Sequence, residues 1–303
     1  MNVKSKTANP KPIPPSELIL NKDGSVYHLN LKPKNIANTI IFVGDQDRVA
    51  KVAKHFDTIT FQTQKREFKT ITGVYKGKKL SVISTGIGPD NIDIVLNELD
   101  ALVNINLKTR TIKKEHLKLS IVRIGTSGSL QRHIPVDSFV LSTYGLGMDG
   151  TLHAYDCEHI LENDIEDAFI KHTNWSKRKA RPYIVKGSAT LEKIISSNTT
   201  FNGFTATANG FYGPQGRVLR LKLQDQELNS KIDNFTYKDL KITNLEMETA
   251  AIYGLAKLLG HEALSMNAII ANRANGTFSE NPAETIENLI KYTLNKLIKL
   301  CKK

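Results

Sequence analysis

Residues 40–56 read Ile-Ile-Phe-Val-Gly-Asp-Gln-Asp-Arg-Val-Ala-Lys-Val-Ala-Lys-His-Phe. The first four residues are apolar and mostly β-branched, which is typical of a short buried strand. From Asp47 to Phe56 the apolar residues recur every three or four positions, which predicts a helix with one buried face. A buried strand that turns through a glycine into an amphipathic helix is the basic unit of α/β proteins.

The same alternation continues along the chain. The expected strands cover residues 40–43, 80–84, 119–124, 138–142, 242–245 and 263–271. Helical spacing covers residues 47–56, 91–103, 247–259 and 283–300. We therefore predict a single α/β domain over residues 17–303, with a central mixed β-sheet flanked by helices. Residues 1–16 contain four prolines and are expected to form a flexible Pro-rich leader.

Composition narrows the class of protein further. The chain has 303 residues, of which 40% are hydrophobic and 24% charged, as in ordinary globular proteins. No apolar run reaches the ~18 residues needed to span a bilayer, and the N-terminus has no apolar segment typical of a secretory signal. The two cysteines, Cys157 and Cys301, cannot build a disulfide framework. This pattern favours the reducing cytoplasm.

The net charge of +12 leaves open whether the partner is a nucleic acid, an anionic substrate or only solvent. Most of the excess lies in three segments, Asn104–Lys118, Lys171–Lys186 and Leu289–Lys303. These segments contain few aromatic residues on which bases could stack. We interpret them as solvated surface and keep a non-catalytic nucleic-acid-binding protein as a remote alternative.

One glycine pattern resembles a nucleotide-binding fingerprint, Gly145-Leu-Gly147-Met-Asp-Gly150. Such a fingerprint should open a helix directly after a strand. The following residues, 151–157, show no helical face. We therefore interpret residues 145–150 as a flexible loop.

Four other loops combine glycine or an aromatic residue with groups suited to an anion. They are Gly44 to Arg48, Thr85 to Gly88, Arg123 to Gly128, and Lys65 to Phe68. Arg123 lies inside an apolar run, where a charged group is costly unless it finds a counter-charge. Ligands bind at the carboxyl ends of strands in α/β sheets, so these loops predict an anion site there.

The segment Leu245-Glu246-Met247-Glu248-Thr249 lies where an expected strand passes into a helix. Two carboxylates at this place fit hydroxyl groups of a sugar. They also fit the positive end of a helix dipole, and residue type alone does not choose between these roles.

Seven short motifs occur in a fixed order. They are Gly-Asp-x-x-Arg at 44–48, Arg-Glu-Phe at 66–68, Ser-Thr-Gly-Ile-Gly at 84–88, Arg-Ile-Gly-Thr-Ser-Gly at 123–128, Phe-Tyr-x-x-Gln-Gly-Arg at 211–217, Glu-Met-Glu at 246–248 and Asn-Arg at 272–273. In this order they resemble the nucleoside phosphorylase family, and within it the uridine phosphorylases. The resemblance runs from about Ser16 to Leu300.

The resemblance implies a pentosyltransferase that cleaves a nucleoside by attack of phosphate on the anomeric carbon. It places phosphate on Gly44, Arg48, Arg123 and Thr126, with Arg66 supplied by a neighbouring subunit. Guanidinium groups suit this role because they bind phosphate oxygens bidentately. The cofactor expectation is inorganic phosphate as co-substrate and no organic group, with room for a monovalent cation near Glu67 but no site for another metal.

The resemblance also implies a ribose site and a base site. Ribose would contact Glu246, Met247 and Glu248, with His28 of a second subunit on the 5′-hydroxyl. The base would contact Phe211, Gln215, Arg217 and Arg273. Catalysis would then rest on Arg48, Arg123, Thr126, Arg217 and Glu248.

Asn209 bears on the substrate, while His28, Arg66 and residues 104–118 bear on the assembly. Asn209 stands where purine-specific relatives carry an aspartic acid, which favours uridine, with deoxyuridine and thymidine as further substrates. A purine or broad-specificity phosphorylase remains the alternative. Shared residues imply at least a homodimer and allow a hexamer built as a trimer of dimers, and residues 104–118 resemble an insertion.

Overall fold

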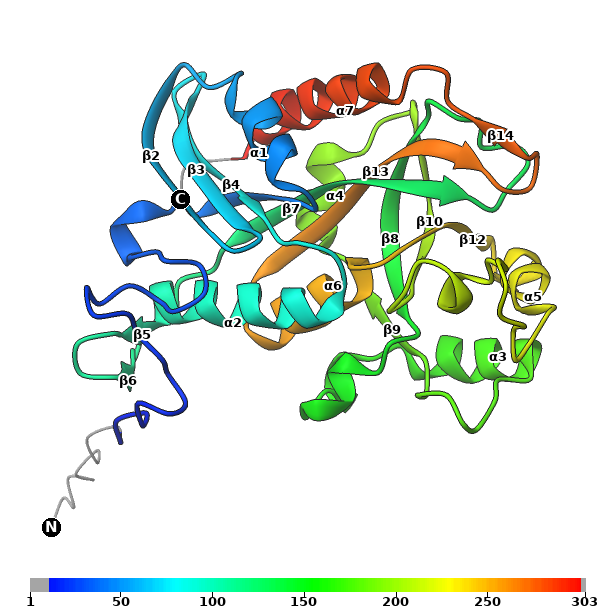
Figure 1. Cartoon of the computed structure of the whole chain (residues 1–303), viewed down its shortest axis with the longest axis horizontal. Coiled ribbons are helices and arrows are strands. Elements are labelled where there is room, and N and C mark those ends of the chain that lie inside the picture. Colours follow the sequence, from blue (N-terminus) through cyan, green and yellow to red (C-terminus); the bar gives the residue numbers. More distant parts are fainter. Residues whose placement is uncertain (1–10, 301–303) are drawn as a thin grey trace, which may run out of the picture.

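The computed structural model describes residues 11–300, and a mixed β-sheet runs through its centre (Figure 1). The strand order is β11-β12-β10-β8-β13-β7-β1-β4-β3-β2, with β14 added to β13 and β9 added to β8. The strands are β1 (Thr39–Val43), β2 (Thr58–Lys65), β3 (Phe68–Tyr75), β4 (Lys78–Ser84), β7 (Ser120–Ser129), β8 (Phe139–Gly147), β9 (Tyr183–Lys186), β10 (Thr200–Thr207), β11 (Thr236–Tyr237), β12 (Leu240–Glu246), β13 (Glu262–Asn272) and β14 (Thr277–Phe278). Strand β13 runs parallel to β7 and antiparallel to β8, so the sheet is mixed.

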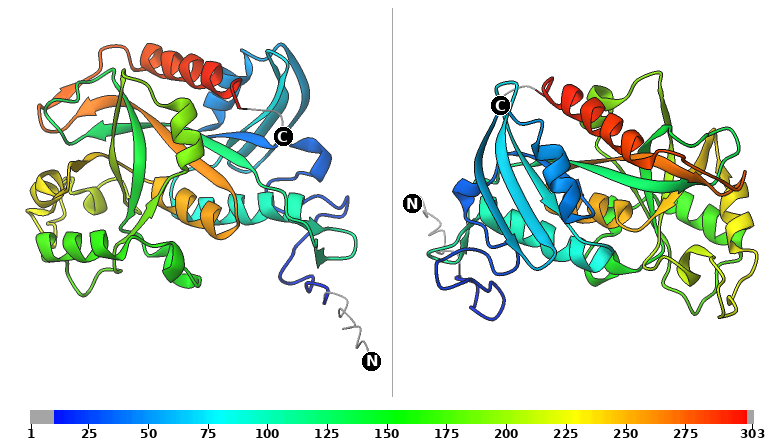
Figure 2. Two further views of the ribbon diagram at one scale, coloured as in Figure 1. Left: turned by 180° about the vertical axis from the view of Figure 1, so that it is seen from behind. Right: turned by 45° about the horizontal axis from the view of Figure 1, so that its top comes forward.

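Helices cover both faces of this sheet. The α-helices are α1 (Gln46–Ala53), α2 (Pro89–Asn104), α3 (Asn163–Thr173), α4 (Ala189–Ile195), α5 (Leu228–Asn234), α6 (Thr249–Leu258) and α7 (Pro282–Leu297). Short 3-10 turns lie at Pro33–Asn35, Thr151–Ala154, Glu158–Ile160 and Gly213–Gln215. Figures 1 and 2 show α2 and α6 on one side of the sheet and α1 and α7 on the other.

Strand β1 shows why the sheet needs both layers. Ile40 and Phe42 belong to the apolar cluster that contains α2 and α6. Ile41 and Val43 belong to the cluster that contains α1 and α7. Successive side chains of a strand point to opposite faces, so a continuous apolar run marks a strand that is buried on both.

The predicted α/β fold with a central mixed sheet and flanking helices is confirmed. All six expected strands and all four expected helices are present, with ends shifted by several residues. The antiparallel pair β2 and β3, the inner strand β10 and helices α3 to α5 have no counterpart in the expected elements. Strand β2 is half exposed, so its apolar pattern is weak.

The interpretation of residues 145–150 as a flexible loop is wrong for its first half, because Gly145 and Gly147 belong to strand β8. A Cβ on Gly145 would lie 2.7 Å from Cα of Ala250, and one on Gly147 would lie 2.1 Å from the Tyr183 ring. These glycines let α6 and Tyr183 pack closely against the strand.

The leader predicted at residues 1–16 and the insertion predicted at residues 104–118 stay predictions. Residues 1–10 of the expected leader lie outside the described residues, and the boundary at 16/17 stays a prediction. Residues 104–118 contain a small hairpin of β5 (Ile105–Asn106) and β6 (Thr111–Ile112). Its Arg110 binds the preceding chain: its carbonyl accepts from Ile13 N at 2.7 Å, and its guanidinium donates to Leu18 O.

No helix within the described residues is long and apolar enough to cross a membrane. The same part of the chain contains no group of three or more His, Cys, Asp or Glu side chains arranged to hold a metal ion.

Helix α1 is fixed at both ends. Asp45 caps it, because its carboxylate accepts from Asp47 N at 2.6 Å and from Arg48 N at 3.1 Å. Beyond its other end, the Glu287 carboxylate of α7 accepts from Lys54 Nζ at 2.8 Å and His55 Nε2 at 2.9 Å. Burial alone would raise the pKa of Glu287, but the contacts with Lys54 and His55 lower it below its ordinary value.

We expect Glu287→Gln to lower the free energy of unfolding by about 0.5–1 kcal/mol near neutral pH. Because the folded-state pKa is depressed, this contribution is present above the ordinary carboxyl pKa and is lost as pH falls through the folded value. Urea denaturation at about pH 7 and about pH 3 measures the difference. Glu284→Gln, on the same helix, is the control, and an equal loss at both pH values for Glu287→Gln would contradict the prediction.

Candidate active site

A pocket of about 310 Å³ lies at one edge of the sheet, beside the ends of β1, β12 and β13 and the second half of β7. Its walls combine buried charges with apolar side chains. The lining residues are Gly44, Asp45, Arg48, Ile87, Arg123, Thr126, Ser127, Gly128, Phe211, Gln215, Arg217, Leu245, Glu246, Met247, Glu248, Ile270, Ala271 and Phe278.

Most of the residues singled out in the sequence meet in this pocket. Those that line it are Gly44, Arg48, Arg123, Thr126, Phe211, Gln215, Arg217, Glu246, Met247 and Glu248. Three others, His28, Arg66 and Arg273, are not among its lining residues. Segments from residue 44 to residue 278 thus converge on one site.

Arg123 is the buried charge at the centre of the site. Its guanidinium lies 3.1 Å from Glu246 and 2.5 Å from Glu248, and it donates to Asn267 Oδ1 at 2.8 Å. Burial alone would lower the pKa of Arg123, but the two carboxylates outweigh it and raise the pKa above its ordinary value. A Cβ at Gly125 would lie 1.8 Å from Arg123 Nη1, so the glycine two positions on makes room for the folded guanidinium.

Glu246 and Glu248 differ in their remaining capacity to accept hydrogen bonds from a ligand. Glu246 accepts from the Thr207 hydroxyl at 2.7 Å and from Glu248 N and Thr249 N at 3.0 Å, besides its contact with Arg123. These amides open α6, so Glu246 fulfils the helix-terminus role that the sequence left open. Glu248 accepts from Gly88 N at 2.9 Å through one oxygen and from Arg123 through the other. Each oxygen keeps accepting capacity for a ligand.

Arg48 differs from Arg123 because the protein compensates its charge only weakly. The side chain is only 12% exposed, yet its nearest carboxylate, Asp45, is 3.8 Å away and mostly in solvent. Its guanidinium also donates to Ile124 O in a long bond of 3.4 Å. Burial lowers the pKa of Arg48, and Asp45 and Glu248 raise it without restoring the ordinary value, while nearby Arg123 lowers it. The Arg48 charge is therefore only partly compensated, and an anion bound beside it would compensate it further.

The opposite end of the pocket is an aromatic and amide surface. The Arg217 guanidinium lies 3.9 Å from the centre of the Phe211 ring and donates to Phe211 O at 2.6 Å and to Gln215 Oε1. Arg273 donates to Gln215 O at 2.9 Å, so it supports the backbone of Gln215 from behind. Burial lowers the pKa of both Arg217 and Arg273. Gln215 itself is buried, which fixes its amide toward the pocket.

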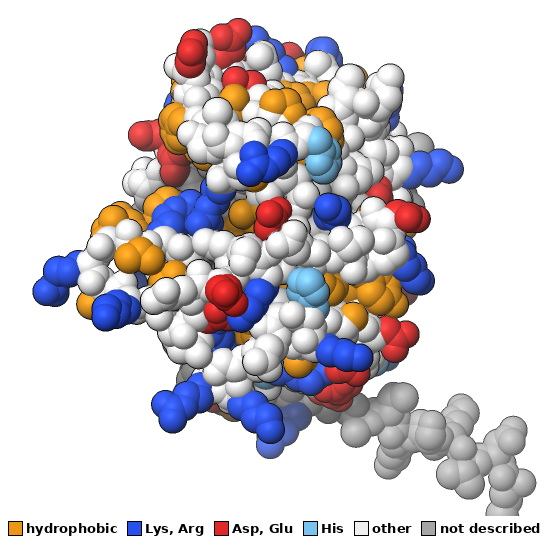
Figure 3. Space-filling view, turned by 90° about the vertical axis from the view of Figure 1, so that its right-hand side faces the viewer, with side chains coloured by type: hydrophobic (Ala, Val, Ile, Leu, Met, Phe, Trp, Pro, Cys, Tyr) orange, Lys and Arg blue, Asp and Glu red, His pale blue; other side chains and the backbone are white. Residues whose placement is uncertain are grey.

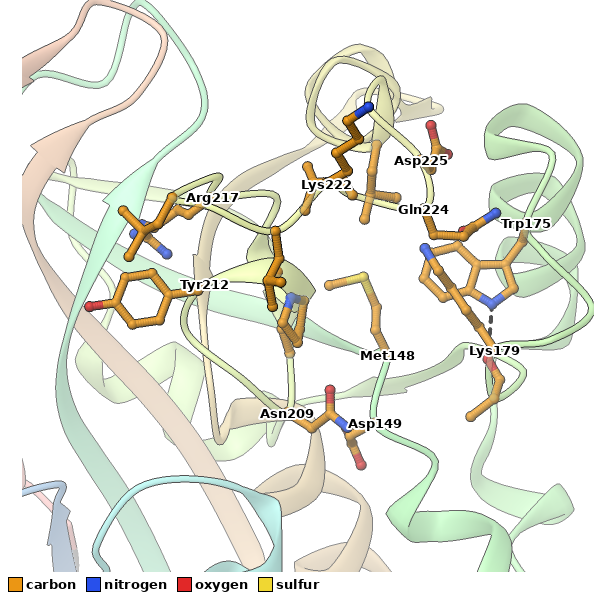
Figure 4. A pocket seen from close by; sticks show the side chains of 18 of the residues that line it. Met148, Asp149, Trp175, Lys179, Asn209, Tyr212, Arg217, Lys222, Gln224 and Asp225 are labelled. Carbon is orange, nitrogen blue, oxygen red and sulfur yellow. Dashed lines mark hydrogen bonds between the residues drawn. The ribbon is translucent and has the colours of Figure 1, made fainter.

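A second, larger cavity of about 800 Å³ adjoins this end, and Arg217 lines both (Figure 4). Asn209 lies in the larger cavity near Asp149, and Trp175 and Lys179 form its far side. Asp149 accepts from the Tyr183 hydroxyl at 3.0 and 2.8 Å. The side chain that replaces the expected purine-specific acid is therefore not among the residues that line the smaller pocket.

Sequence reasoning missed several wall residues. Ile87 and Phe278 both line the pocket although they are 70% and 64% exposed. Phe278 sits on β14, which follows the turn after Arg273 and pairs back onto Ala271. The sequence signal available for Phe278 was that it is the one aromatic residue in a polar loop. Its position in the pocket, however, depends on the two-residue pairing of β14 with β13. Ser127 is another wall residue that was missed, and its hydroxyl accepts a hydrogen bond from Asn244 Nδ2 at 2.8 Å.

His28 and Arg66 lie together outside the lining of this pocket. Arg66 occupies the turn between β2 and β3 with φ of +54°. Its guanidinium is 6.0 Å from the Tyr27 ring, and the His28 ring is 4.9 Å from that same ring. The two residues thus form one cluster around Tyr27 rather than part of their own chain's pocket.

Comparison with known proteins agrees with this geometry. The family model described as the phosphorylase superfamily matches residues 38–301. The chain belongs to this superfamily. It is an enzyme of the nucleoside phosphorylase type, a pentosyltransferase.

Individual relatives span most of the chain. A uridine phosphorylase of Thermococcus kodakarensis is 28% identical over 261 residues, which are 86% of this chain and 82% of that protein. A DeoD-type purine nucleoside phosphorylase of Streptococcus suis is 26% identical over 280 residues, covering 89% and 98%. The solved nucleoside phosphorylase of Trypanosoma brucei, described as showing uridine phosphorylase activity, superposes with a TM-score of 0.84 at 28% identity, covering 93% and 99%.

The two buried arginines should differ in their effect on stability. Arg123→Met leaves Glu246 and Glu248 buried without a cation, so we expect a loss of about 3–5 kcal/mol in the free energy of unfolding. Arg48→Met removes a charge that lacks a close counter-ion, so we expect a change below about 1 kcal/mol. Denaturant titration of both variants measures the two losses in the free energy of unfolding. Equal losses would contradict the difference in charge compensation between Arg123 and Arg48.

Proposed function

We propose that this enzyme is a uridine phosphorylase. A phosphate oxygen bonds to the anomeric carbon of uridine, the bond from that carbon to N1 breaks, and the electron pair leaves with uracil. The products are ribose 1-phosphate and, after protonation, uracil. The observation that carries the proposal is the polarity of one pocket: the buried and weakly compensated guanidinium of Arg48 at one end, and the Gln215–Arg217 pair at the other.

Phosphate would bind at the cationic end. Arg48 and Arg123 offer guanidinium donors there, while Gly44 allows close approach of the backbone and Thr126 offers a hydroxyl. A phosphate anion would compensate the charge of Arg48, whereas the charge of Arg123 is already compensated by Glu246 and Glu248. No organic cofactor enters the proposed reaction, since phosphate is both nucleophile and co-substrate.

Ribose would lie between the two ends. Glu248 is the better acceptor for its hydroxyls, because Glu246 is already bound to Thr207 and to the first amides of α6. Met247 contributes the wall between them. Holding the sugar against a fixed phosphate provides the orientation that such a displacement requires.

Uracil would lie against Phe211 with its polar edge toward Gln215. An amide side chain matches a base edge that presents both a donor and an acceptor. Arg217 would stabilise the negative charge that develops on the leaving base. Asn209 lines the neighbouring cavity and cannot act as an acid, which supports pyrimidine over purine substrates.

The active unit would be at least a homodimer. His28 and Arg66 gather around Tyr27 and do not line the pocket of their own chain, which supports their donation to a partner's site. There Arg66 would complete the phosphate site and His28 would reach the ribose 5′-hydroxyl. A hexamer built from such dimers is compatible with this contact.

The first test is the release of uracil from uridine with and without phosphate, alongside inosine and thymidine. We expect turnover that requires phosphate and prefers uridine over inosine. Arg217→Ala should lower kcat/KM for uridine about a hundredfold, while the apparent affinity for phosphate stays within about threefold. Equal uracil release without phosphate would indicate hydrolysis instead, and dominant inosine turnover would indicate a purine phosphorylase.

The second test is complementation between inactive subunits. Arg66→Ala and Arg217→Ala each remove one part of a shared site, so a mixed dimer should contain one intact site and one doubly defective site. Coexpression in equal amounts should restore about a quarter of wild-type activity. Arg217→Ala mixed with Gln215→Ala is the control, because both changes affect the pocket of their own chain and leave no intact site. Absence of recovery in the first pair alone would place Arg66 outside the partner's site.

A further inference from the structure

We propose that Glu98 of α2 is a positioning residue that orients His28 toward the ribose 5′-hydroxyl in the partner's site. The proposal rests on the proposed function, because it presumes that His28 is donated across the dimer. Glu98 carries no feature in the sequence that separates it from the other acidic residues of the chain.

The Glu98 carboxylate is hydrogen-bonded to the backbone and side chain of His28 and to the backbone of Leu29. Its Oε1 accepts from His28 N at 2.9 Å and lies 2.7 Å from His28 Nδ1. Its Oε2 accepts from Leu29 N at 2.8 Å and from His28 N at 3.1 Å. The carboxylate is 14% exposed and the histidine side chain 26%, so the pair is sheltered while the ring still reaches the surface.

These bonds fix the tautomer as well as the position. Backbone amides only donate, so both carboxylate oxygens act as acceptors and His28 Nδ1 must carry the hydrogen that faces Glu98. In the neutral imidazole the second nitrogen, Nε2, is then the acceptor, and it has no hydrogen-bond partner within residues 11–300. A neutral imidazole held this way accepts a hydrogen bond from a hydroxyl group.

The Tyr27 ring completes the support of the histidine. It meets the His28 ring edge to face with centroids 4.9 Å apart. Lys65 fixes the same turn, since its ammonium donates to Tyr27 O and lies 4.2 Å from the Tyr27 ring centre. The loop backbone is therefore held by several contacts, and what Glu98 adds is the orientation of the imidazole.

Helix α2 joins this support to the chain's own pocket. At its N-terminus, Gly88 N donates to Glu248, the proposed ribose acceptor. Glu98 lies ten residues further along, roughly 15 Å at 1.5 Å per residue. One rigid helix thus carries contacts to the sugar site of its own chain and to the histidine offered to the partner.

The test pairs variants with a substrate that lacks the relevant hydroxyl. Wild type, Glu98→Gln and His28→Ala are assayed for phosphorolysis of uridine and of 5′-deoxyuridine. We expect Glu98→Gln to lower kcat/KM for uridine about five- to tenfold, mostly through KM, and to leave 5′-deoxyuridine within about twofold. The Glu98→Gln/His28→Ala double variant should be no worse than His28→Ala alone.

Asp93→Asn serves as the matched control, because Asp93 is a carboxylate of the same helix that binds Tyr155 rather than His28. It should leave both substrates unchanged. Thermal denaturation of each variant reports any loss of folding. Equal losses on uridine and 5′-deoxyuridine for Glu98→Gln would show a merely structural role, and no loss on uridine would show no role; either result overturns the inference.

Failure of the proposed function gives a different pattern. Absence of phosphate-dependent uridine turnover by the wild type would overturn the uridine phosphorylase assignment, and this inference with it. If His28→Ala affects the two substrates equally, then His28 does not contact the 5′-hydroxyl and Glu98 has nothing to position.

Discussion

The ion cluster around Arg123 is the constraint on which the rest of the site depends. A guanidinium inside a central strand is costly, and here Glu246 at the end of β12 and Glu248 at the N-cap of α6 compensate it at 3.1 and 2.5 Å. Those carboxylates also bind Gly88 N, Thr249 N and the Thr207 hydroxyl, so one cluster ties β7, β10, α2 and α6 together. Gly125 is required because the folded guanidinium occupies the space of its side chain. Glu248, the proposed ribose acceptor, is thereby placed by the same contacts that stabilise the core.

The pocket contains two buried arginines, Arg123 and Arg48, whose charges are compensated to different degrees. Arg123 is balanced within the protein, and its pKa is raised by carboxylates. Arg48 is desolvated at the start of α1 with no close counter-ion, and its pKa is lowered. Only the second kind of charge gains much when an anion binds, because the first has already been compensated. The surface charge plays no such part: on the face shown in Figure 3, Lys and Arg side chains are interspersed with acidic and uncharged ones rather than forming a continuous stripe.

The sequence alone predicts the buried strands and the charged loops well, because both depend on local composition. The run 40–43 must be buried on two faces, and Arg123 must find carboxylates, whatever the remaining chain does. The errors arise where tertiary packing decides. Gly145 and Gly147 belong to a strand because Ala250 and Tyr183 press against them, a fact that no local pattern carries. Phe278 reaches the pocket through the short β14 pairing, and Glu98 gains its role from a loop seventy residues earlier in the chain.

The proposed assembly would depend on His28 and Arg66. Glu98 holds His28 by hydrogen bonds, Arg66 lies 6.0 Å from the Tyr27 ring, and neither residue lines the pocket of its own chain. Fixing a polar side chain at a surface costs conformational entropy without stabilising the fold much. That cost is understandable if the ordered groups act on a neighbour. Since α2 contacts Glu248 at one end and His28 further along, the proposed dimer would join the proposed sugar contacts of two sites through this helix.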